Sequence, residues 1–502
     1  MALRVLSQIN YSAGENADGD SGLNFTGNLL RALVAKDADL HFYVMVPERH
    51  AAIWEAVLDH PQITPVVLPL QPRLHGGDFQ FDPAELYRRF DLRRFDVDLL
   101  FLNQPETAPA FLQFFNRQMF HNVPCISYLH WFDTRRPSTP KQRVHEPALL
   151  AALTGLAVSD EVGCNSRYGR DQVLAHARRW FHADAVAALS QRIRILPPPV
   201  NATELAPRRR PRKNPLPLIL INHRLLKYTG VRTALTTVLP RFWQDNKSFH
   251  VHVTNPSRMR LAGTITQVPW LTVETLPRSD YVKLLQRCDI VVAPHRATHW
   301  SISTVEAICA GCVPLMNVEG FFPEMFEPIL ASLPQSVAKH ISGRWFYFRG
   351  SILSRLQSLF DNLSEEREIA RTVAVLAGQF YGYDAWVDPW LDMFHAAERR
   401  IPVMADRNPS LLRILDMLRR NGATSKQMIL RELGWAPKQR GLSWTAFRKN
   451  LRQLASDDSR SPEAIFELFA PSEPAELQEE AGLSAPDGVK KAHDLADDLS
   501  GA

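Results

Sequence analysis

The chain has 502 residues, a formal net charge of +5 and a globular composition, with 45% hydrophobic and 22% charged residues. This length exceeds one ordinary hydrophobic core and predicts two domains with an appendage. No run approaches the roughly 20 apolar residues that span a bilayer, which argues against integral membrane association. The first residues lack the basic, apolar and small-residue order of a signal peptide, so we expect a cytoplasmic protein.

Short apolar segments alternate with helical patterns through the first 200 residues. Leu3–Ile9 is a predicted strand, and a polar, glycine-rich loop (Ser12–Gly22) leads from it to a helix that contains Phe25. Further predicted strands are Leu40–Val46, Val97–Leu102, Pro124–Leu129 and Gly155–Cys164, with a helix from Arg167. Such alternation predicts an α/β domain with a parallel sheet, which we assign to residues 1–205.

A proline-rich stretch (Ile195–Asn201) and a basic run (Arg208–Pro215) predict an interdomain linker. The alternation then restarts. Predicted strands are Leu218–Asn222, Phe249–Thr254, Asp289–Ala293 and Val313–Met316, and predicted helices are Arg232–Phe242, Tyr281–Arg287 and Val305–Ala310. Residues 216–380 therefore form a second predicted Rossmann-like domain, and a ligand site is expected at the carboxyl ends of both sheets.

Residues 405–456 form a predicted basic module of three short helices, and residues 457–502 an acidic, largely flexible tail. The module resembles a helix-turn-helix or winged helix, with Ser443–Leu454 as its recognition helix. The candidate nucleic-acid contacts in it are Lys438, Arg440, Arg448, Lys449 and Arg452. A small helical bundle with a solvated basic face is the alternative interpretation.

Five cysteines occur in apolar segments, and Cys309 and Cys312 have CxxC spacing. No second Cys or His pair accompanies them, which favours reduced core thiols over a zinc or redox site. We therefore expect no metal site.

The segment Ser301–Phe326 is the most specific in the chain. A helix is predicted to begin near Ser303, with Glu306 in its first turn, and to end at Gly311. A helix N-terminus offers unpaired N–H groups and partial positive charge to a nucleotide diphosphate. A carboxylate there can accept hydrogen bonds from both ribose hydroxyls.

This segment resembles the donor-binding motif of the retaining two-domain (GT-B) glycosyltransferases that include sucrose and glycogen synthases. In that family a Glu-x7-Glu motif places one carboxylate near the sugar and the other on the ribose. Glu306 matches the second, whereas Thr298 stands in place of the first. The resemblance implies further donor-binding residues at His299, Trp300, Ser301, Ser303 and Thr304.

Other matches follow in the family's order. Ile219–Gly230 resembles the strand and loop that carry phosphate ligands, which implies Asn222, Arg224 and Lys227 as donor-binding residues. Two cations there would offset charge on the leaving diphosphate without a metal ion. No GxGxxG is present, so no dinucleotide cofactor is expected, and a UDP- or GDP-sugar is the expected substrate.

The resemblance also reaches the first domain. Tyr128–Asp133 matches a loop whose histidine reaches the donor sugar, which implies His130 as a catalytic residue beside Arg224 and Lys227. Gly22 is a donor-side candidate, and Asp133 an acceptor-side candidate. Residues 381–404 resemble the helix that crosses back onto the first domain.

The resemblance spans Leu3–Glu398. The residues of its motifs are most similar to those of the queuosine-tRNA mannosyltransferase group. With the basic C-terminal module, it predicts sugar transfer to a hydroxymethylated DNA base or a modified tRNA base. One alternative is a transferase of surface polysaccharide or glycolipid synthesis. Another is a non-catalytic nucleic-acid-binding protein with a degenerate transferase body.

Overall fold

The structure is a computed structural model. It describes residues 3–8, 21–48, 58–72, 79–81, 97–119, 123–130, 145–207, 216–223, 229–254, 268–295, 299–348 and 350–400. One compact unit comprises Met1–Asp91, Phe95–Asn116 and Asn122–Ile401, and the fold below is that of this unit. The basic module predicted at 405–456 and the tail at 457–502 lie outside the described residues.

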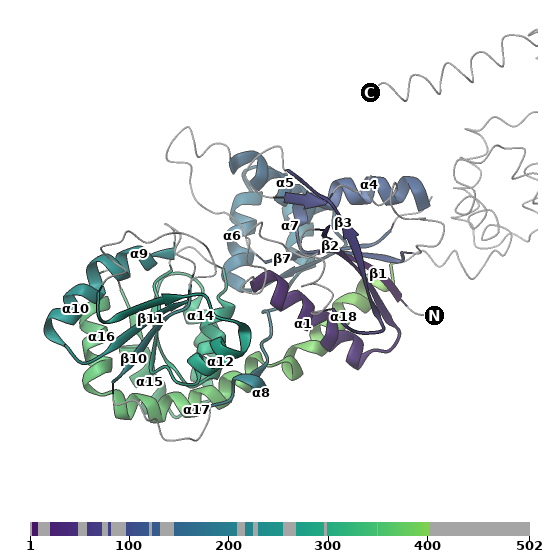
Figure 1. Ribbon diagram of the computed structural model, residues 1–502. Helices are drawn as coiled ribbons and strands as arrows, with labels where there is room; N and C mark the ends of the chain where they lie inside the picture. Colours follow the sequence, from purple (N-terminus) through teal and green to yellow (C-terminus); the bar gives the residue numbers. More distant parts are fainter. Residues whose placement is uncertain are drawn as a thin grey trace, which may run out of the picture. The chain divides into compact units, whose positions relative to one another are not determined.

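The first domain is built on a parallel sheet of seven described strands, in the order β3-β2-β1-β6-β7-β8-β9 (Figure 1). The strands are β1 (Leu3–Gln8), β2 (Leu40–Pro47), β3 (Ile63–Leu68), β6 (Leu99–Leu102), β7 (Cys125–Leu129), β8 (Glu161–Cys164) and β9 (Ile193–Ile195). Residues of β6, β7 and β8 are buried throughout, as expected of a parallel sheet covered on both faces. The order reverses between β1 and β6.

Helices connect these strands. They are α1 (Ser21–Lys36), η3 (Pro105–Thr107), α4 (Ala108–Met119), α5 (His145–Val158), α6 (Arg167–Ala177) and α7 (Ala183–Arg192). A short antiparallel pair, β4 (Leu70–Pro72) and β5 (Phe79–Phe81), stands apart from the main sheet.

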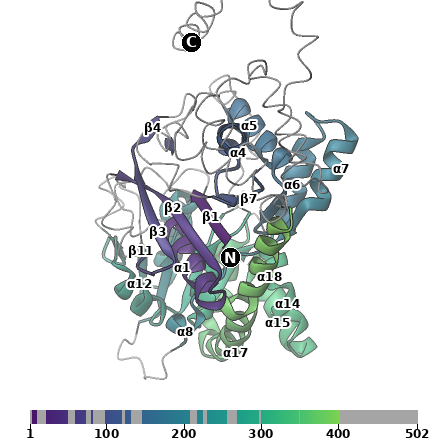
Figure 2. The ribbon, with the colours of Figure 1, turned by 90° about the vertical axis from the view of Figure 1, so that its right-hand side faces the viewer.

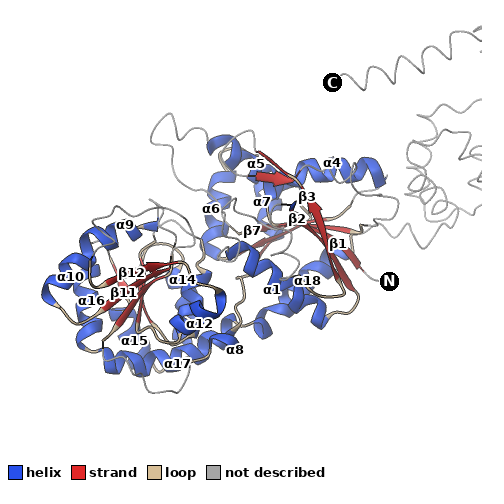
Figure 3. Cartoon of the chain, in the orientation of Figure 1, coloured by secondary structure: helices blue, strands red, loops and turns tan. Residues whose placement is uncertain are grey.

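The second domain contains a parallel sheet of six described strands, in the order β12-β11-β10-β13-β14-β15 (Figure 3). They are β10 (Leu218–Ile221), β11 (His250–Thr254), β12 (Leu271–Glu274), β13 (Ile290–Ala293), β14 (Val313–Asn317) and β15 (Phe346–Tyr347). Its helices are α8 (Ala202–Leu205), α9 (Val231–Thr233), α10 (Leu239–Asp245), α12 (Arg278–Leu285), α13 (Ile302–Cys309), α14 (Phe322–Ala331), α15 (Gln335–Arg344), α16 (Ile352–Asp361) and α17 (Leu363–Tyr381).

The predicted helix Arg232–Phe242 is present, but it is not a single regular α-helix. A π-helical turn, η6 (Ala234–Val238), separates α9 from α10. Pro240 then stands in the first turn of α10, and its missing N–H interrupts the regular hydrogen bonding of the continuing helix. The other predicted strands and helices within the described residues are present with shifted ends.

Helix α18 (Tyr383–Glu398) completes the core of the first domain although it follows the second domain in sequence. Trp390 is fully buried, with its ring centroid 4.8 Å from that of Tyr128 and 6.0 Å from that of Phe25. Figure 2 shows α18 beside α1. The chain therefore passes twice between the domains, and Val200 and Gly382 pair where it does so.

Within the described residues, no helix combines the length and the apolar character that crossing a membrane requires. The cysteines are all buried and unbridged. Burial raises the pKa of the Cys309 thiol to about 12, so this group stays protonated near neutral pH. The exact boundaries assigned to the predicted domains stay predictions.

Candidate functional site

The strand order of the second sheet reverses between β10 and β13. These strands pair in parallel, with Ile219 opposite Ile290. Their carboxyl ends therefore lie side by side, and the residues that follow are Asn222 and His223 after β10 and His295 shortly after β13. In open α/β sheets, ligands bind at such a reversal point.

Helix α13 begins at this edge of the sheet. Ser301 is its N-cap, because its side-chain oxygen accepts a hydrogen bond from the backbone N–H of Thr304 at 3.2 Å. The helix therefore starts at Ile302, and the prediction that Glu306 lies in its first turn is wrong. Glu306 lies in the second turn.

Asn222 connects the end of β10 to the start of α13. Its side-chain amide donates to the backbone oxygen of Ser303 at 2.7 Å and to the hydroxyl of Tyr281 at 3.0 Å. Only 7% of Asn222 is exposed, and within the described part of the chain its Oδ1 atom has no hydrogen-bond partner. The structure thus brings Asn222, Ser303 and Thr304 together, and their donor-binding role stays a prediction.

Glu306 is held by an arginine that the sequence analysis did not identify. The guanidinium of Arg278 pairs with the Glu306 carboxylate and, at 2.9 Å, with that of Glu204. Burial alone would lower the pKa of Arg278, but the charges of Glu306 and Glu204 outweigh it and raise this pKa. Burial and the charge of Glu306 raise the pKa of Tyr281 well above its ordinary value. Glu306, Arg278 and Tyr281 therefore belong to one partly buried network.

Two histidines also belong to this site and were not identified from the sequence. The ring centroids of His223 and His295 are 3.6 Å apart, with the ring planes at 70°. Burial lowers the pKa of His295 to about 4. Burial and the neighbouring His295 lower the pKa of His223 well below its ordinary value. Both imidazoles are therefore neutral near neutral pH.

His299 and Trp300 make contacts of a different kind. The backbone oxygen of His299 accepts a hydrogen bond from Ser166, the N-cap of α6 in the first domain, at 2.7 Å. The Trp300 ring packs against Phe321 and Tyr381 at 5.7 and 5.5 Å between centroids. The described contacts of these two residues are thus packing and inter-domain contacts, and their donor-binding role stays a prediction.

The candidates of the first domain lie at its sheet edge. His130 follows β7, its ring stacks on Phe25 at 5.7 Å, and its backbone oxygen accepts a hydrogen bond from Asn165 at 2.9 Å. Gly22 lies inside α1 and not in a preceding loop, because the helix begins at Ser21, earlier than predicted. The remaining candidates lie outside the described residues; they are Arg224, Lys227, Thr298, Asp133, Lys438, Arg440, Arg448, Lys449 and Arg452.

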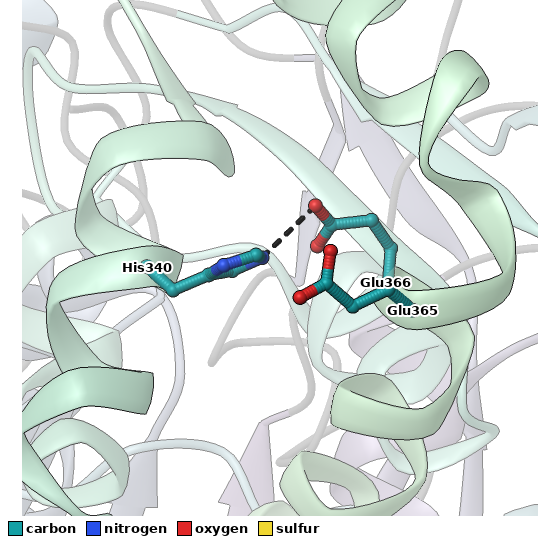
Figure 4. A group of neighbouring side chains, drawn as sticks. All are labelled: His340, Glu365 and Glu366. Atoms are coloured by element: carbon teal, nitrogen blue, oxygen red, sulfur yellow. Dashed lines mark hydrogen bonds and ion pairs between the residues drawn. The ribbon is translucent and has the colours of Figure 1, made fainter.

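A second group of ionisable side chains lies on α15 and α17, and consists of His340, Glu365 and Glu366 (Figure 4). Their ligand atoms lie within 4.8 Å of one another, close enough to share a metal ion. The buried carboxylate of Glu366, however, already accepts hydrogen bonds from His340 at 3.0 Å, Arg344 at 3.0 Å and Trp345 at 2.7 Å. The positive charge of Arg344 beside this carboxylate favours a buried ion-pair network over a cation site.

No protein-family model and no curated protein matches the sequence. Among solved structures, a glycosyltransferase from Rickettsia africae matches with a TM-score of 0.56 at 12% identity, over 80% of this chain and 99% of that chain. A sucrose-phosphate synthase from Thermosynechococcus elongatus matches with a TM-score of 0.56 at 13% identity, over 79% and 98% of the two chains.

The Anabaena protein HepE, solved in complex with UDP-glucose, matches with a TM-score of 0.54 at 11% identity, over 78% of this chain and 100% of that chain. The chain has the GT-B fold. Its two parallel-sheet α/β domains confirm the fold class predicted from the sequence.

Proposed function

We propose that this protein is a glycosyltransferase that takes its sugar from a nucleotide-sugar donor. The observation that carries the proposal is the convergence of Asn222, Ser303 and Glu306 at the strand-order reversal of the second sheet, beside the N-terminus of α13. HepE, which has a similar fold, was solved with UDP-glucose, and this supports a UDP-sugar as the donor. A GDP-sugar is the other donor to test.

In the proposed reaction the bond between the sugar and the diphosphate breaks while an acceptor oxygen bonds to the sugar, with retention of configuration. Charge then develops on the leaving diphosphate. The N–H groups that begin α13, together with Arg224 and Lys227, would stabilise this charge, so we propose no metal ion in the reaction. Glu306 would accept the ribose hydroxyls, and His130 would contact the sugar.

We propose a nucleic-acid base as the acceptor, either a hydroxymethylated base in DNA or a modified base in tRNA. Two features of the sequence support it: the basic residues within 405–456 and the resemblance to the queuosine-tRNA mannosyltransferase group. A base in a duplex would have to leave the stack or present its hydroxyl in a groove.

The test is product mass analysis with the full chain, UDP- and GDP-sugars, and three acceptor classes: hydroxymethylated DNA, tRNA and lipid-linked glycan. A hexose or pentose mass on a nucleoside supports the whole proposal. Sugar only on lipid or glycan would refute the nucleic-acid acceptor and leave a polysaccharide or glycolipid transferase. Donor binding without turnover on any acceptor would favour the non-catalytic alternative.

Two variants sharpen this test. Glu306→Gln removes the charge at the proposed ribose ligand and is expected to abolish most turnover. Glu327→Gln, a matched change at an exposed position of α14, is expected to retain it. The double charge reversal Lys449→Glu with Arg452→Glu should weaken transfer to nucleic acid and spare donor hydrolysis.

A further inference from the structure

His223 bridges two hydroxyl side chains at the start of α13. Its Nδ1 atom lies 3.1 Å from Oγ of Ser303, and its Nε2 atom lies 3.4 Å from Oγ1 of Thr304. Ser303 is partly exposed, whereas Thr304 is fully buried. The imidazole therefore joins a buried hydroxyl to one at the surface of the site.

The imidazole has one donor and one acceptor nitrogen, because it is neutral. His223 is only 5% exposed, and the ring of His295 beside it adds a second unfavourable interaction for a proton. A neutral ring that contacts two hydroxyls must donate to one of them and accept from the other. The tautomer thus decides which hydroxyl keeps its proton for another partner.

The remaining contacts favour one direction. Ser301 lies 2.8 Å from Thr304 between hydroxyl oxygens, so it can donate to Thr304, which in turn donates to Nε2 of His223. Nδ1–H then donates to Ser303, and the Ser303 proton is left for a ligand. In the opposite tautomer Nε2–H donates to Thr304, Thr304 donates to Ser301, and the spare proton is that of Ser301, which is only 6% exposed and whose one other hydroxyl neighbour within the described residues is Ser303 at 3.4 Å. That separation is longer than the 2.5–3.0 Å usual for a hydroxyl pair.

We infer that His223 is a positioning residue that holds the Ser303 hydroxyl as a hydrogen-bond donor toward a diphosphate oxygen of the nucleotide-sugar. This inference rests on the proposed function. Asn222 fixes the same residue from the other side through the Ser303 backbone oxygen. The N-terminal end of α13 adds partial positive charge, which favours an anion where the Ser303 proton points.

The test begins with calorimetric binding of UDP and GDP to the wild-type full chain. Ser303→Ala and His223→Leu should each weaken binding of the preferred nucleotide about tenfold to a hundredfold, as expected for a hydrogen bond to a charged group. The double variant should bind the nucleotide with about the affinity of the single variant that binds less tightly, because both changes remove the same interaction. His223→Asn, which keeps a donor near the Nδ1 position, should restore much of the affinity.

His250→Leu is the matched control, since His250 contacts a hydroxyl, Thr272 Oγ1 at 2.9 Å, on the neighbouring strands. It should bind nucleotide as the wild type does. A second readout is the ¹⁵N spectrum of the His223 ring, which should show the neutral Nδ1–H tautomer with nucleotide bound. If His223→Leu fails to fold, the nucleotide affinity of Ser303→Ala and the ¹⁵N spectrum of the wild type still test the role of His223.

The outcomes separate the two proposals. If the wild type binds neither UDP, GDP nor their sugars, the proposed function fails and the inference fails with it. If the wild type binds but Ser303→Ala binds equally well, or the ring is the Nε2–H tautomer, only the role of His223 is overturned. Additive losses in the double variant would also overturn it.

Discussion

Arg278 and Glu306 form an ion pair that ties the first residue of α12 to the second turn of α13. Arg278 also binds Glu204 in α8, so one guanidinium pairs with two carboxylates. The proposed ribose ligand is thus oriented before any nucleotide arrives. The orientation of the Glu306 carboxylate therefore depends on Arg278, which lies in a different helix.

Replacing Arg278 with Gln should therefore lower both stability and donor affinity. The change leaves two partly buried carboxylates without their cation, and we expect a loss of about 1–3 kcal/mol in the free energy of unfolding. Urea unfolding and donor titration measure the two effects. Lys283→Gln, which breaks an exposed pair with Asp280 on the same helix, should cost less than about 0.5 kcal/mol. Equal losses in both variants would contradict the role assigned to Arg278.

Acidification should destabilise the protein through the two buried histidines. A histidine in the unfolded chain titrates near pH 6.5, whereas burial lowers the pKa of His295 to about 4 in the folded chain. Between these values the unfolded state binds a proton that the folded state does not, so stability falls as the pH falls. His295 alone should contribute roughly 3 kcal/mol across this window at 1.36 kcal/mol per pH unit.

Urea unfolding of the wild type and of His295→Gln, at pH 7 and at pH 4, checks this prediction. The variant should lose less stability on acidification than the wild type does. His182→Gln, at an exposed position, should behave as the wild type. If the free energy of unfolding of the wild type and of His295→Gln had the same pH dependence, His295 would not be the group responsible.

Glu324 should matter for stability more than its neighbour Glu327. Its carboxylate accepts hydrogen bonds from the backbone N–H groups of Arg167 at 2.6 Å and Tyr168 at 2.8 Å, and so caps helix α6. Glu324→Ala should lower the free energy of unfolding by about 0.5–2 kcal/mol, the range for loss of a helix cap. Glu327→Ala removes an exposed partner of Arg167 and should cost under about 0.5 kcal/mol. Chemical denaturation of both variants gives the comparison.

The network around Glu366 should be structural. Glu366→Gln removes the charge opposite Arg344 and places an amide N–H group against either Trp345 or the pair His340 and Arg344, because these donors bond different carboxylate oxygens; we expect a loss of about 3 kcal/mol in the free energy of unfolding. Glu365→Gln, at the exposed neighbouring position, should have little effect. Because a bound metal stabilises the folded state, a rise in the Tm of the wild type on addition of Zn²⁺ would contradict this interpretation.

Part of the site followed from the sequence because it depends on local order along the chain. Asn222 comes directly after a buried strand and Ser303 lies in the first turn of the helix after another, and parallel strands place such residues at one edge. His223 and His295 follow the same buried strands, so the same signal could have identified them. Only their burial and their mutual contact show that they are neutral.

Other features were not accessible from the sequence. Ser301 and Ser303 are both suitable N-cap residues, and only the hydrogen bond of Ser301 to Thr304 shows where α13 begins. That choice moved Glu306 from the first turn to the second. Arg278 reaches Glu306 because α12 and α13 both pack against α8 in the tertiary structure, and their sequence separation carries no such signal.

The position of α18 has a consequence for synthesis of the chain on the ribosome. Trp390 and Phe394 fill the apolar face of a sheet whose strands are all complete by residue 195. At typical elongation rates of 5–20 residues per second, α18 is synthesised on the order of 10 to 40 seconds after the last strand of this sheet. During this interval the nascent first domain exposes apolar surface, so a chaperone that shields it should raise the yield of folded protein more than one acting after release.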